Sequence, residues 1–291
     1  MESNPNSLWI ECRNIYKNFG KKVALENVDI KMWKGVNLVI GKNGSGKSTL
    51  ISLIEGLSKP TSGTIRVLGE DPTKKYGELM KRMAFLPERP IAYSDGKVKD
   101  FYEQFMRFNR VEEDSLNRMI SIFDIDYLLK SKFKSLSLGE MQLVVLSATL
   151  SIQRDGYVLD EPNSNLDESN RAKLWKLLER MGEEGKRILV VSHIPDQVVD
   201  FSESIFIFNS GRVISIINRE NYWKSRNIVH VIRCKNTESL CQSLKEYKPI
   251  CRKNTIEIEG ASLGEMMASL PKESLNEILS ITNHMEINLD E

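Results

Sequence analysis

A chain of 291 residues is long enough for one large hydrophobic core and a smaller second one, because single cores stop growing near about 250 to 300 residues. Its 41 Lys and Arg residues almost cancel its 40 Asp and Glu residues, which argues against nucleic acid as the main partner. The chain has no run of 18 or more apolar residues and starts with a polar stretch over 1–7, so we expect neither a membrane span nor a secretory signal, and a protein of the cytoplasm.

Short apolar runs bounded by turn residues predict strands in the first part of the chain. These runs cover residues 8–13, 27–32, 37–40 and 64–68. The third run leads into a glycine-rich loop and then into a helical pattern over 48–56. A strand, a loop and a helix therefore follow one another without a break.

Helical periodicity dominates the middle of the chain, over 98–108, 116–123 and 141–152. Beyond it, two buried-type strands alternate with a helix, and a hairpin-like pair of strands follows. These elements cover residues 156–159, 170–181, 187–192, 204–208 and 212–217. Because strands alternate with helices, we expect an α/β fold with a mostly parallel sheet covered on both faces.

The pattern of elements starts again after residue 218. Strands over 228–234 and 255–259 and helices over 238–247 and 263–270 follow in alternation. We therefore expect a main domain over 1–217 and a small α+β domain over 218–291.

The four cysteines lack the close paired spacings of zinc sites and of thioredoxin-type redox motifs. In the cytoplasm such cysteines are expected to stay reduced and to serve as ordinary structural residues. They are Cys12, Cys234, Cys241 and Cys251.

The strongest chemical signal is the stretch from Gly41 to Ser48, which fits the phosphate-loop pattern of Gly, four residues, then Gly-Lys-Ser. Glycines let the backbone wrap so that its N–H groups face phosphate oxygens, and the helix that follows adds its positive end. Lys47 would bridge the terminal phosphates and the Ser48 hydroxyl would hold Mg²⁺. The predicted phosphate-binding residues are Gly41, Lys42, Asn43, Gly44, Ser45, Gly46, Lys47, Ser48 and Thr49.

A second signal is the acidic pair Asp160 and Glu161, which follows the buried-type strand over 156–159. Open α/β sheets bind ligands at the carboxyl ends of their strands. Asp160 would orient Mg²⁺ through its water shell, and Glu161 would polarise the water that attacks in phosphoryl transfer. An Asp-Glu pair alone could equally be a helix cap, and it is the phosphate loop that makes it a candidate site.

With these two motifs in this order, residues 8–217 resemble the nucleotide-binding domain of the ABC ATPase superfamily. The resemblance implies a P-loop NTPase core with an antiparallel β subdomain and a helical subdomain over about 89–140. Three further stretches extend it in the expected order. Residues 136–140 resemble the signature Leu-Ser-Gly-Gly-Gln, residues 165–167 the loop at the dimer interface, and His193 the switch histidine that senses the γ-phosphate.

In this family the signature completes the ATP site of the partner subunit, and the resemblance assigns that role to Ser137, Gly139 and Glu140. Ser137 can cap the helix that starts near Glu140, so that backbone N–H groups and a helix dipole point at an external phosphate. Leu138 and Glu140 replace the family's glycine and glutamine. The resemblance also places Asp167 in the dimer-interface loop.

Two further positions match the family's pattern with substitutions or rivals. Phe19 stands where the family stacks an aromatic ring on adenine; Tyr16 competes for that role, and stacking leaves both ATP and GTP open. Glu88 stands where a glutamine reaches toward Mg²⁺, and a carboxylate supplies the same oxygen ligand. Residues 90–93 offer either an apolar groove for a partner's coupling helix or a segment that packs inward.

The resemblance implies an ATP hydrolase that drives a membrane transporter from the cytoplasmic face of the membrane. Its implied partners are ATP with Mg²⁺, a second copy or a paralogous ATPase subunit, and a separate transmembrane permease. Glu88, Leu138 and the small second domain together resemble subunits of ABC-2-type exporters. The alternatives are a soluble ABC ATPase that acts on ribosomes or DNA, and a phosphate-loop kinase, in which Ser137 and Asp167 would have no role.

Overall fold

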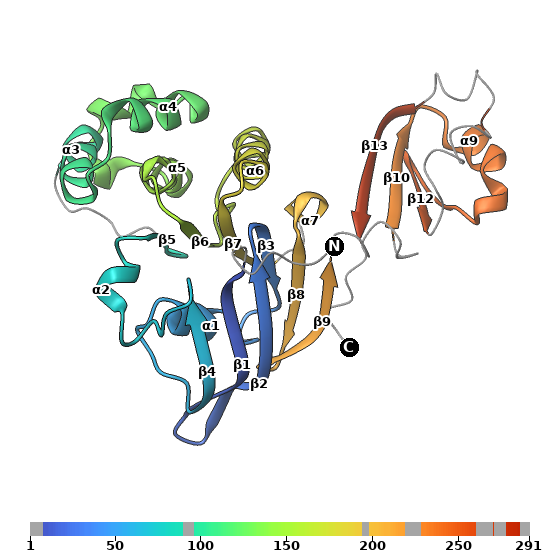
Figure 1. Ribbon diagram of the computed structural model, residues 1–291. Coiled ribbons are helices and arrows are strands. Elements are labelled where there is room, and N and C mark those ends of the chain that lie inside the picture. The colour runs from blue at the N-terminus through green and yellow to red at the C-terminus, as the bar shows by residue number, and fades with distance from the viewer. Residues whose placement is uncertain are drawn as a thin grey trace. The chain divides into compact units, whose positions relative to one another are not determined.

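The computed structural model of the protein describes residues 8–89, 96–193, 198–218, 228–259, 270 and 278–285 (Figure 1). The chain forms two compact units, residues 1–216 and 217–291. The sequence had placed a domain boundary between 217 and 218.

A sheet of six strands forms the centre of the first unit. Its strands are β3 (Gly35–Ile40), β5 (Met83–Leu86), β6 (Gly156–Asp160), β7 (Arg187–Ser192), β8 (Ser204–Asn209) and β9 (Arg212–Asn218). They lie in the order β5-β6-β7-β3-β8-β9. β3 pairs in parallel with β7 and β8, and β6 pairs in parallel with β5 and β7. All six residues of β3 are buried, as expected for a parallel strand covered on both faces.

A separate antiparallel sheet contains β1 (Leu8–Phe19), β2 (Lys22–Trp33) and β4 (Ser62–Val67), in the order β2-β1-β4. β1 extends six residues beyond the strand predicted over 8–13. The difference arises from an irregular register after Cys12, where Asn14 has a φ of 46° and breaks the alternation of buried and exposed residues.

The helix α1 (Lys47–Ile54) starts directly after the glycine-rich loop. One hydrophobic core joins it to both sheets, with Trp9 and Leu25 from the antiparallel sheet, Leu50 from α1 and Phe206 from β8 all buried. Because α1 packs against both sheets, the position of the loop before it is fixed as well.

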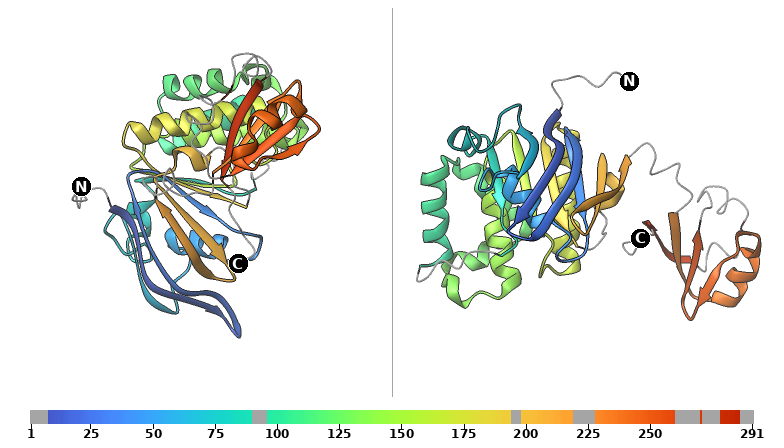
Figure 2. Two further views of the ribbon diagram at one scale, coloured as in Figure 1. Left: turned by 90° about the vertical axis from the view of Figure 1, so that its right-hand side faces the viewer. Right: turned by 90° about the horizontal axis from the view of Figure 1, so that it is seen from below.

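The remaining helices of the first unit group mainly at one side of the central sheet. They are α3 (Val98–Asn109), α4 (Glu113–Phe123), α5 (Leu138–Ser151) and α6 (Glu168–Glu183). The unit also contains the short helices α2 (Tyr76–Leu79) and α7 (Val198–Phe201) and two 3₁₀ segments over 126–130 and 133–135. Figure 2 shows the green α3, α4 and α5 on the side of this unit opposite the blue antiparallel strands. Within the described residues, no helix combines the length and the apolar character needed to cross a membrane.

The second unit contains an antiparallel sheet of four strands in the order β11-β12-β10-β13. They are β10 (Ile228–Cys234), β11 (Ile250–Arg252), β12 (Thr255–Glu259) and β13 (Ile278–Met285). The helix α9 (Thr237–Ser243) packs Leu240 against Ile232 and Ile256 of the sheet in a small core. Of the helix predicted over 263–270, only Leu270 lies within the described residues.

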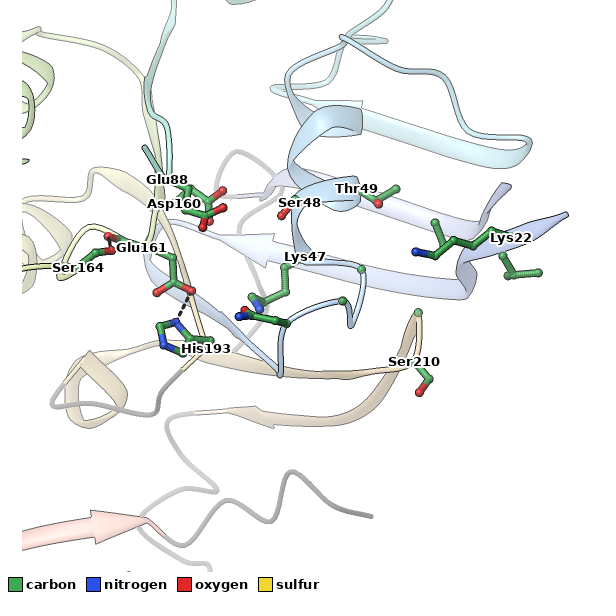
Figure 3. Close-up of a pocket in the computed structure, with 16 residues that line it drawn as sticks. Lys22, Lys47, Ser48, Thr49, Glu88, Asp160, Glu161, Ser164, His193 and Ser210 are labelled. Carbon is green, nitrogen blue, oxygen red and sulfur yellow. Dashed lines mark hydrogen bonds and ion pairs between the residues drawn. The ribbon is translucent and has the colours of Figure 1, made fainter. Parts of the chain in front are cut away.

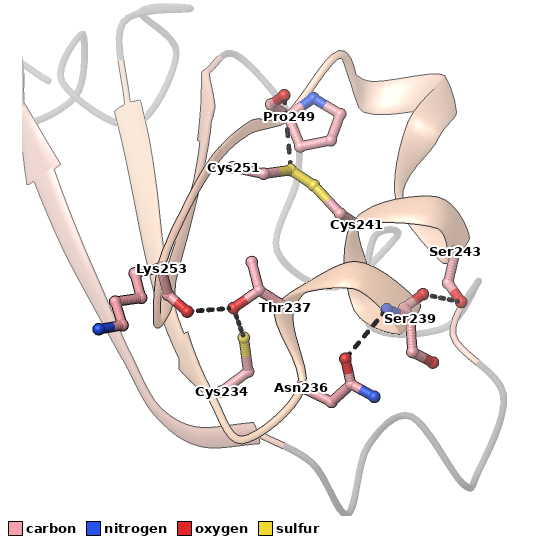
Figure 4. The surroundings of a disulfide bond; sticks show 9 residues. All are labelled: Cys234, Asn236, Thr237, Ser239, Cys241, Ser243, Pro249, Cys251 and Lys253. Carbon is pink, nitrogen blue, oxygen red and sulfur yellow. Dashed lines mark hydrogen bonds between the residues drawn. A yellow bond between two sulfur atoms is a disulfide. The ribbon is translucent and has the colours of Figure 1, made fainter.

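The expectation for two of the cysteines is wrong. Cys241 of α9 and Cys251 of β11 form a disulfide with a Cα–Cα distance of 6.4 Å (Figure 4), whereas Cys12 and Cys234 are free and buried. Their spacing carries no motif. The pairing follows from the return of β11 alongside α9, which is a tertiary contact.

Candidate functional site

A cavity of about 370 Å³ opens in the first unit where the predicted motifs meet (Figure 3). Its lining comes from the start of β2, the glycine-rich loop with the first turn of α1, the segment after β5, the end of β6, the residue after β7 and the turn between β8 and β9. Motifs that are far apart in the sequence therefore share one site, because the parallel strands end at the same edge of the sheet.

Ten of the predicted site residues line this cavity: Asn43, Gly44, Gly46, Lys47, Ser48, Thr49, Glu88, Asp160, Glu161 and His193. Gly41, Lys42 and Ser45 belong to the frame of the same loop. The predicted residues Phe19, Ser137, Gly139, Glu140 and Asp167 lie outside the lining.

The glycine-rich loop keeps its shape through close backbone contacts. Gly46 has a φ of 109°, and a Cβ at this position would come within 2.8 Å of the Ala24 carbonyl oxygen, so only glycine fits. The N–H of Gly211 donates to the Ser45 carbonyl at 2.9 Å and ties the loop to the turn after β8. The first turn of α1 lines the cavity, and N–H groups there have no acceptor within the helix. This geometry suits a bound phosphate.

Lys47 is the buried cation of the loop. Its Nζ donates to the Gly41 carbonyl at 2.6 Å and to the Lys42 carbonyl at 3.2 Å. Burial lowers the pKa of this ammonium group, and the carboxylates of Glu161 and Asp160 oppose that shift. The group is therefore held among carboxylates where a phosphate would lie.

Asp160 and Glu88 both line the cavity and are near enough for their charges to interact, and Figure 3 draws both toward Ser48. Burial raises the pKa of Asp160 to about 7, the neighbouring charges of Glu161 and Glu88 raise it as well, and Lys47 opposes the change. In the described part of the chain, no group of three or more His, Cys, Asp and Glu residues could hold a metal ion by itself. Mg²⁺ usually binds through one or two carboxylates together with substrate phosphates, so these oxygen donors fit an Mg²⁺ ion that arrives with a nucleotide.

The raised pKa of Asp160 predicts a pH-dependent cost to folding. The pKa of Asp160 is about 7 in the folded protein and 3.8 ordinarily, so a proton on this carboxyl favours the folded state. This stabilisation is complete below about pH 4 and is lost as the pH rises through about 7. The neutral variant Asp160→Asn is therefore expected to be more stable than the native protein at pH 8, with a gap that shrinks toward pH 5. Urea unfolding in metal-free buffer at several pH values measures this gap, and a gap independent of pH would contradict the assignment.

Glu161 is held in a single orientation directly after β6. Its backbone has a φ of 48°, and its N–H donates to the Val191 carbonyl of β7 at 2.8 Å. Its carboxylate contacts His193 Nδ1 at 2.8 Å through Oε1 and accepts from the Ser192 hydroxyl at 3.3 Å through Oε2. Two neighbours thus fix a buried carboxylate that faces the cavity, while the His193 side chain remains 45% exposed.

Gln142 and Ser164 also support Glu161, although the sequence analysis did not single them out. The fully buried amide of Gln142, on α5, donates to the carbonyls of Glu161 at 3.5 Å and Pro162 at 3.3 Å. The Ser164 hydroxyl donates to the Glu161 carbonyl at 2.6 Å. A glutamine within the apolar run 141–146 was the one signal in the sequence that pointed to such a role.

Replacing Gln142 with leucine is expected to lower kcat by about three- to tenfold and to leave the ATP dissociation constant unchanged. The leucine fills a similar volume but leaves the buried Pro162 carbonyl without this donor, while the Glu161 carbonyl keeps the Ser164 hydroxyl; we expect a cost of about 1 kcal/mol in the positioning of Glu161. Steady-state hydrolysis and nucleotide titration separate the two effects. The control is Thr149→Val on the same helix, and an equal fall in kcat there would mean that only the packing of α5 matters.

The signature-like segment forms a second surface, at the start of α5. Ser137 caps this helix as predicted, and the helix begins at Leu138, before the expected start near Glu140. Glu140 Oε2 accepts from the Ser137 N–H and from the Ser137 hydroxyl, both at 2.9 Å. The bond from the Ser137 N–H holds the pKa of Glu140 below its usual range, and the exposed Tyr127 O–H donates to its other oxygen at 3.5 Å.

The predicted interface loop packs against this second surface. A Cβ at Gly139 would lie 2.5 Å from the carbonyl oxygen of Asn165, so a glycine is needed for this close approach. Asp167 caps α6 and accepts from the Asn170 N–H at 2.8 Å. The signature-like segment and the residues after Glu161 are therefore in direct contact.

The aromatic residues predicted to stack on adenine are not part of the lining, although Phe19 pairs with the lining residue Lys22. Phe19 is 53% exposed and has Lys17 Nζ 4.8 Å from its ring centre, and Tyr16 is 37% exposed. Lys22 and Val23 line the cavity at that side. Residues 90–93, considered as a groove for a partner, lie outside the described residues.

Comparison with known proteins places this chain in a family. The family model described as ABC transporter matches residues 25–164. A petrobactin import ATP-binding protein of Bacillus subtilis is 32% identical over 215 residues, 70% of this chain and 85% of the relative. A zinc import ATP-binding protein of Rickettsia conorii is 30% identical over 213 residues, 72% of this chain and 87% of the relative. A probable multidrug ABC transporter ATP-binding protein of Escherichia coli is 28% identical over 224 residues, and the match covers 74% of this chain but 38% of that relative.

Solved structures show the same fold. The ATP-binding subunit of an ABC transporter matches with a TM-score of 0.67 and 22% identity, over 89% of this chain and 98% of that one. A bacterial ABC transporter cassette solved as a dimer matches with a TM-score of 0.63 and 23% identity, over 72% of this chain and 98% of that one.

Proposed function

The chain belongs to the ABC transporter family of ATP-binding subunits and is an ATPase of the ABC type, and we propose that it drives an exporter by ATP-dependent dimerisation coupled to a separate membrane-spanning subunit. One observation carries the proposal. The cavity gathers the phosphate loop, the acidic pair and His193, while Ser137 and Gly139 lie outside it on a surface of their own. A chain that carries these two parts at separate places suits a site completed by a second copy or by a paralogous subunit.

The chemistry of the cavity accounts for each step that this chain's residues perform. Lys47 and the first-turn amides of α1 bind the terminal phosphates, and Ser48 and Glu88 directly, with Asp160 through a water shell, would hold Mg²⁺. When bound, Mg²⁺ neutralises the charge that develops on the transferred phosphate. Glu161 orients the attacking water and accepts its proton, because its carboxylate is buried and faces the cavity.

His193 has two roles in this proposal. Its Nδ1 holds Glu161 at 2.8 Å, and its partly exposed ring lines the cavity, where it can contact the terminal phosphate. The presence of that phosphate is thereby linked to the orientation of the carboxylate.

The direction of transport and the membrane partner rest on departures from the family pattern. Glu88 and Leu138 replace a glutamine and a glycine, and a small α+β unit follows the ATPase core, a combination that resembles ABC-2-type exporters. The relatives include proteins named for import and one named for multidrug transport. The subunit would act at the cytoplasmic face of the membrane through its partner.

The decisive experiment isolates the chain with its co-purifying membrane protein and reconstitutes the pair in vesicles. Export predicts accumulation of cargo on the side opposite the ATPase, with ATP hydrolysis that depends on the membrane protein. Import that requires a solute-binding protein would overturn the direction. Hydrolysis stimulated by ribosomes or DNA, with no effect of the membrane protein, would instead support a soluble ABC ATPase.

A further inference from the structure

Building on the proposed function, we propose that Glu88 makes nucleotide binding itself, and not only hydrolysis, conditional on a divalent cation. Glu88 follows β5, the neighbour of β6, and Leu86 of β5 lies opposite Leu159 of β6. Because β5 and β6 run in parallel, the segments after them leave the sheet at the same edge, which brings the charge of Glu88 within reach of Asp160. The register of β5 and β6 sets the position of residue 88, and the glutamate at that position supplies a negative charge.

The charges around the cavity are unbalanced toward the negative. Of the described side chains that line it, three are carboxylates, Glu88, Asp160 and Glu161, and two are ammonium groups, Lys22 and Lys47. A neutral glutamine in place of Glu88 would remove one negative charge from this lining. A free nucleoside triphosphate is a polyanion, so Glu88 supplies the excess charge that repels it.

The charge of Glu88 reaches into the cavity, where it acts on Lys47 and Asp160. Lys47 is engaged with the carbonyls of Gly41 and Lys42, and within the described residues Glu88 forms no ion pair with a Lys or Arg. Ser48 and Asp160 complete a set of oxygen donors on the same side of the cavity. A divalent cation bound there would be coordinated by these oxygens. The carboxylate of Glu88, which repels the free nucleotide, would therefore favour binding of its magnesium complex.

The size of the effect follows from the position of Glu88 at the rim. Its side chain is exposed, so solvent and salt screen it in part. We expect Glu88→Gln to raise the affinity for metal-free ATP about tenfold at low ionic strength, and to change the affinity for Mg-ATP by less than about threefold. Added salt should shrink the difference.

The experiment is a calorimetric titration of the full chain with ATP, once with excess EDTA and once with magnesium. The native protein should bind much more weakly in EDTA, and Glu88→Gln should lose most of that difference through tighter binding in EDTA. Glu88→Asp, which keeps the charge, should behave as the native protein does. Glu103→Gln makes the same change at an exposed site on α3 and should have no effect.

The outcomes separate this inference from the proposed function. If Glu88→Gln binds metal-free ATP as weakly as the native protein, the inference is wrong although the ATPase assignment stands. If no variant binds ATP even with magnesium, the nucleotide site itself is refuted. Glu88→Ala provides a second neutral variant should the glutamine variant unfold, with thermal melting as the check.

Discussion

Replacing Glu161 with glutamine is expected to lower ATP turnover about 100- to 10,000-fold while ATP remains bound. The amide has the shape of the carboxylate but cannot accept the proton of the attacking water. The loss should appear in kcat, because Glu161 does not hold the phosphates. Phosphate release measures the first effect, and an ATP-dependent dimer on size exclusion measures the second.

A matched control for Glu161→Gln is Ser192→Ala, which removes the hydroxyl on Oε2 but keeps the carboxylate and its contact with His193. It should reduce turnover by less than about tenfold, the effect of one hydrogen bond. Undiminished turnover in Glu161→Gln would refute the role of this residue. A weakened affinity for ATP would show that Glu161 mainly shapes the cavity.

Replacing Lys47 with alanine is expected to weaken ATP binding by about 10- to 100-fold, the effect of losing a charged hydrogen-bond donor to phosphate. Lys47 is the buried cation of the loop, and its carboxylate neighbours remain in place, so the variant leaves an acidic cavity. Fluorescence titration with a nucleotide analogue measures the affinity. Lys21→Ala, in the turn between β1 and β2, removes an exposed lysine and should leave binding intact.

The structural role of Lys47 requires its own check. Its bonds to the Gly41 and Lys42 carbonyls hold the loop, so Lys47→Ala also removes two contacts of the protein with itself. Thermal melting without nucleotide reports that loss. A variant that melts as the native protein does and still binds ATP at native affinity would contradict the assignment of Lys47 to the phosphates.

The local motifs were predictable from the sequence because their chemistry is contiguous. The phosphate loop lies between a strand and a helix, and β7 was predicted with its observed bounds because every residue from Ile188 to Val191 is apolar and buried. β5 and β11 were missed, since three or four residues are too few to show a period. β13 was missed as well.

The rest of the site depends on contacts between distant segments. Gln142 and Ser192 support Glu161 from α5 and β7, and no spacing in the sequence links these three residues. The disulfide between Cys241 and Cys251 depends in the same way on the return of a short strand. Proposals that rest on such contacts therefore required the fold as well as the motifs.

Helix α5 touches the segment after Glu161 at two levels. Gly139 in its first turn closely approaches the carbonyl of Asn165, and the Gln142 amide, one turn later, donates to the carbonyl of Pro162. A tilt of α5 would therefore also move the segment between Pro162 and Asn165. If a second copy binds a nucleotide against the start of α5, as proposed above, that contact would act on the segment that follows Glu161, and we expect hydrolysis at the two proposed sites to be coupled.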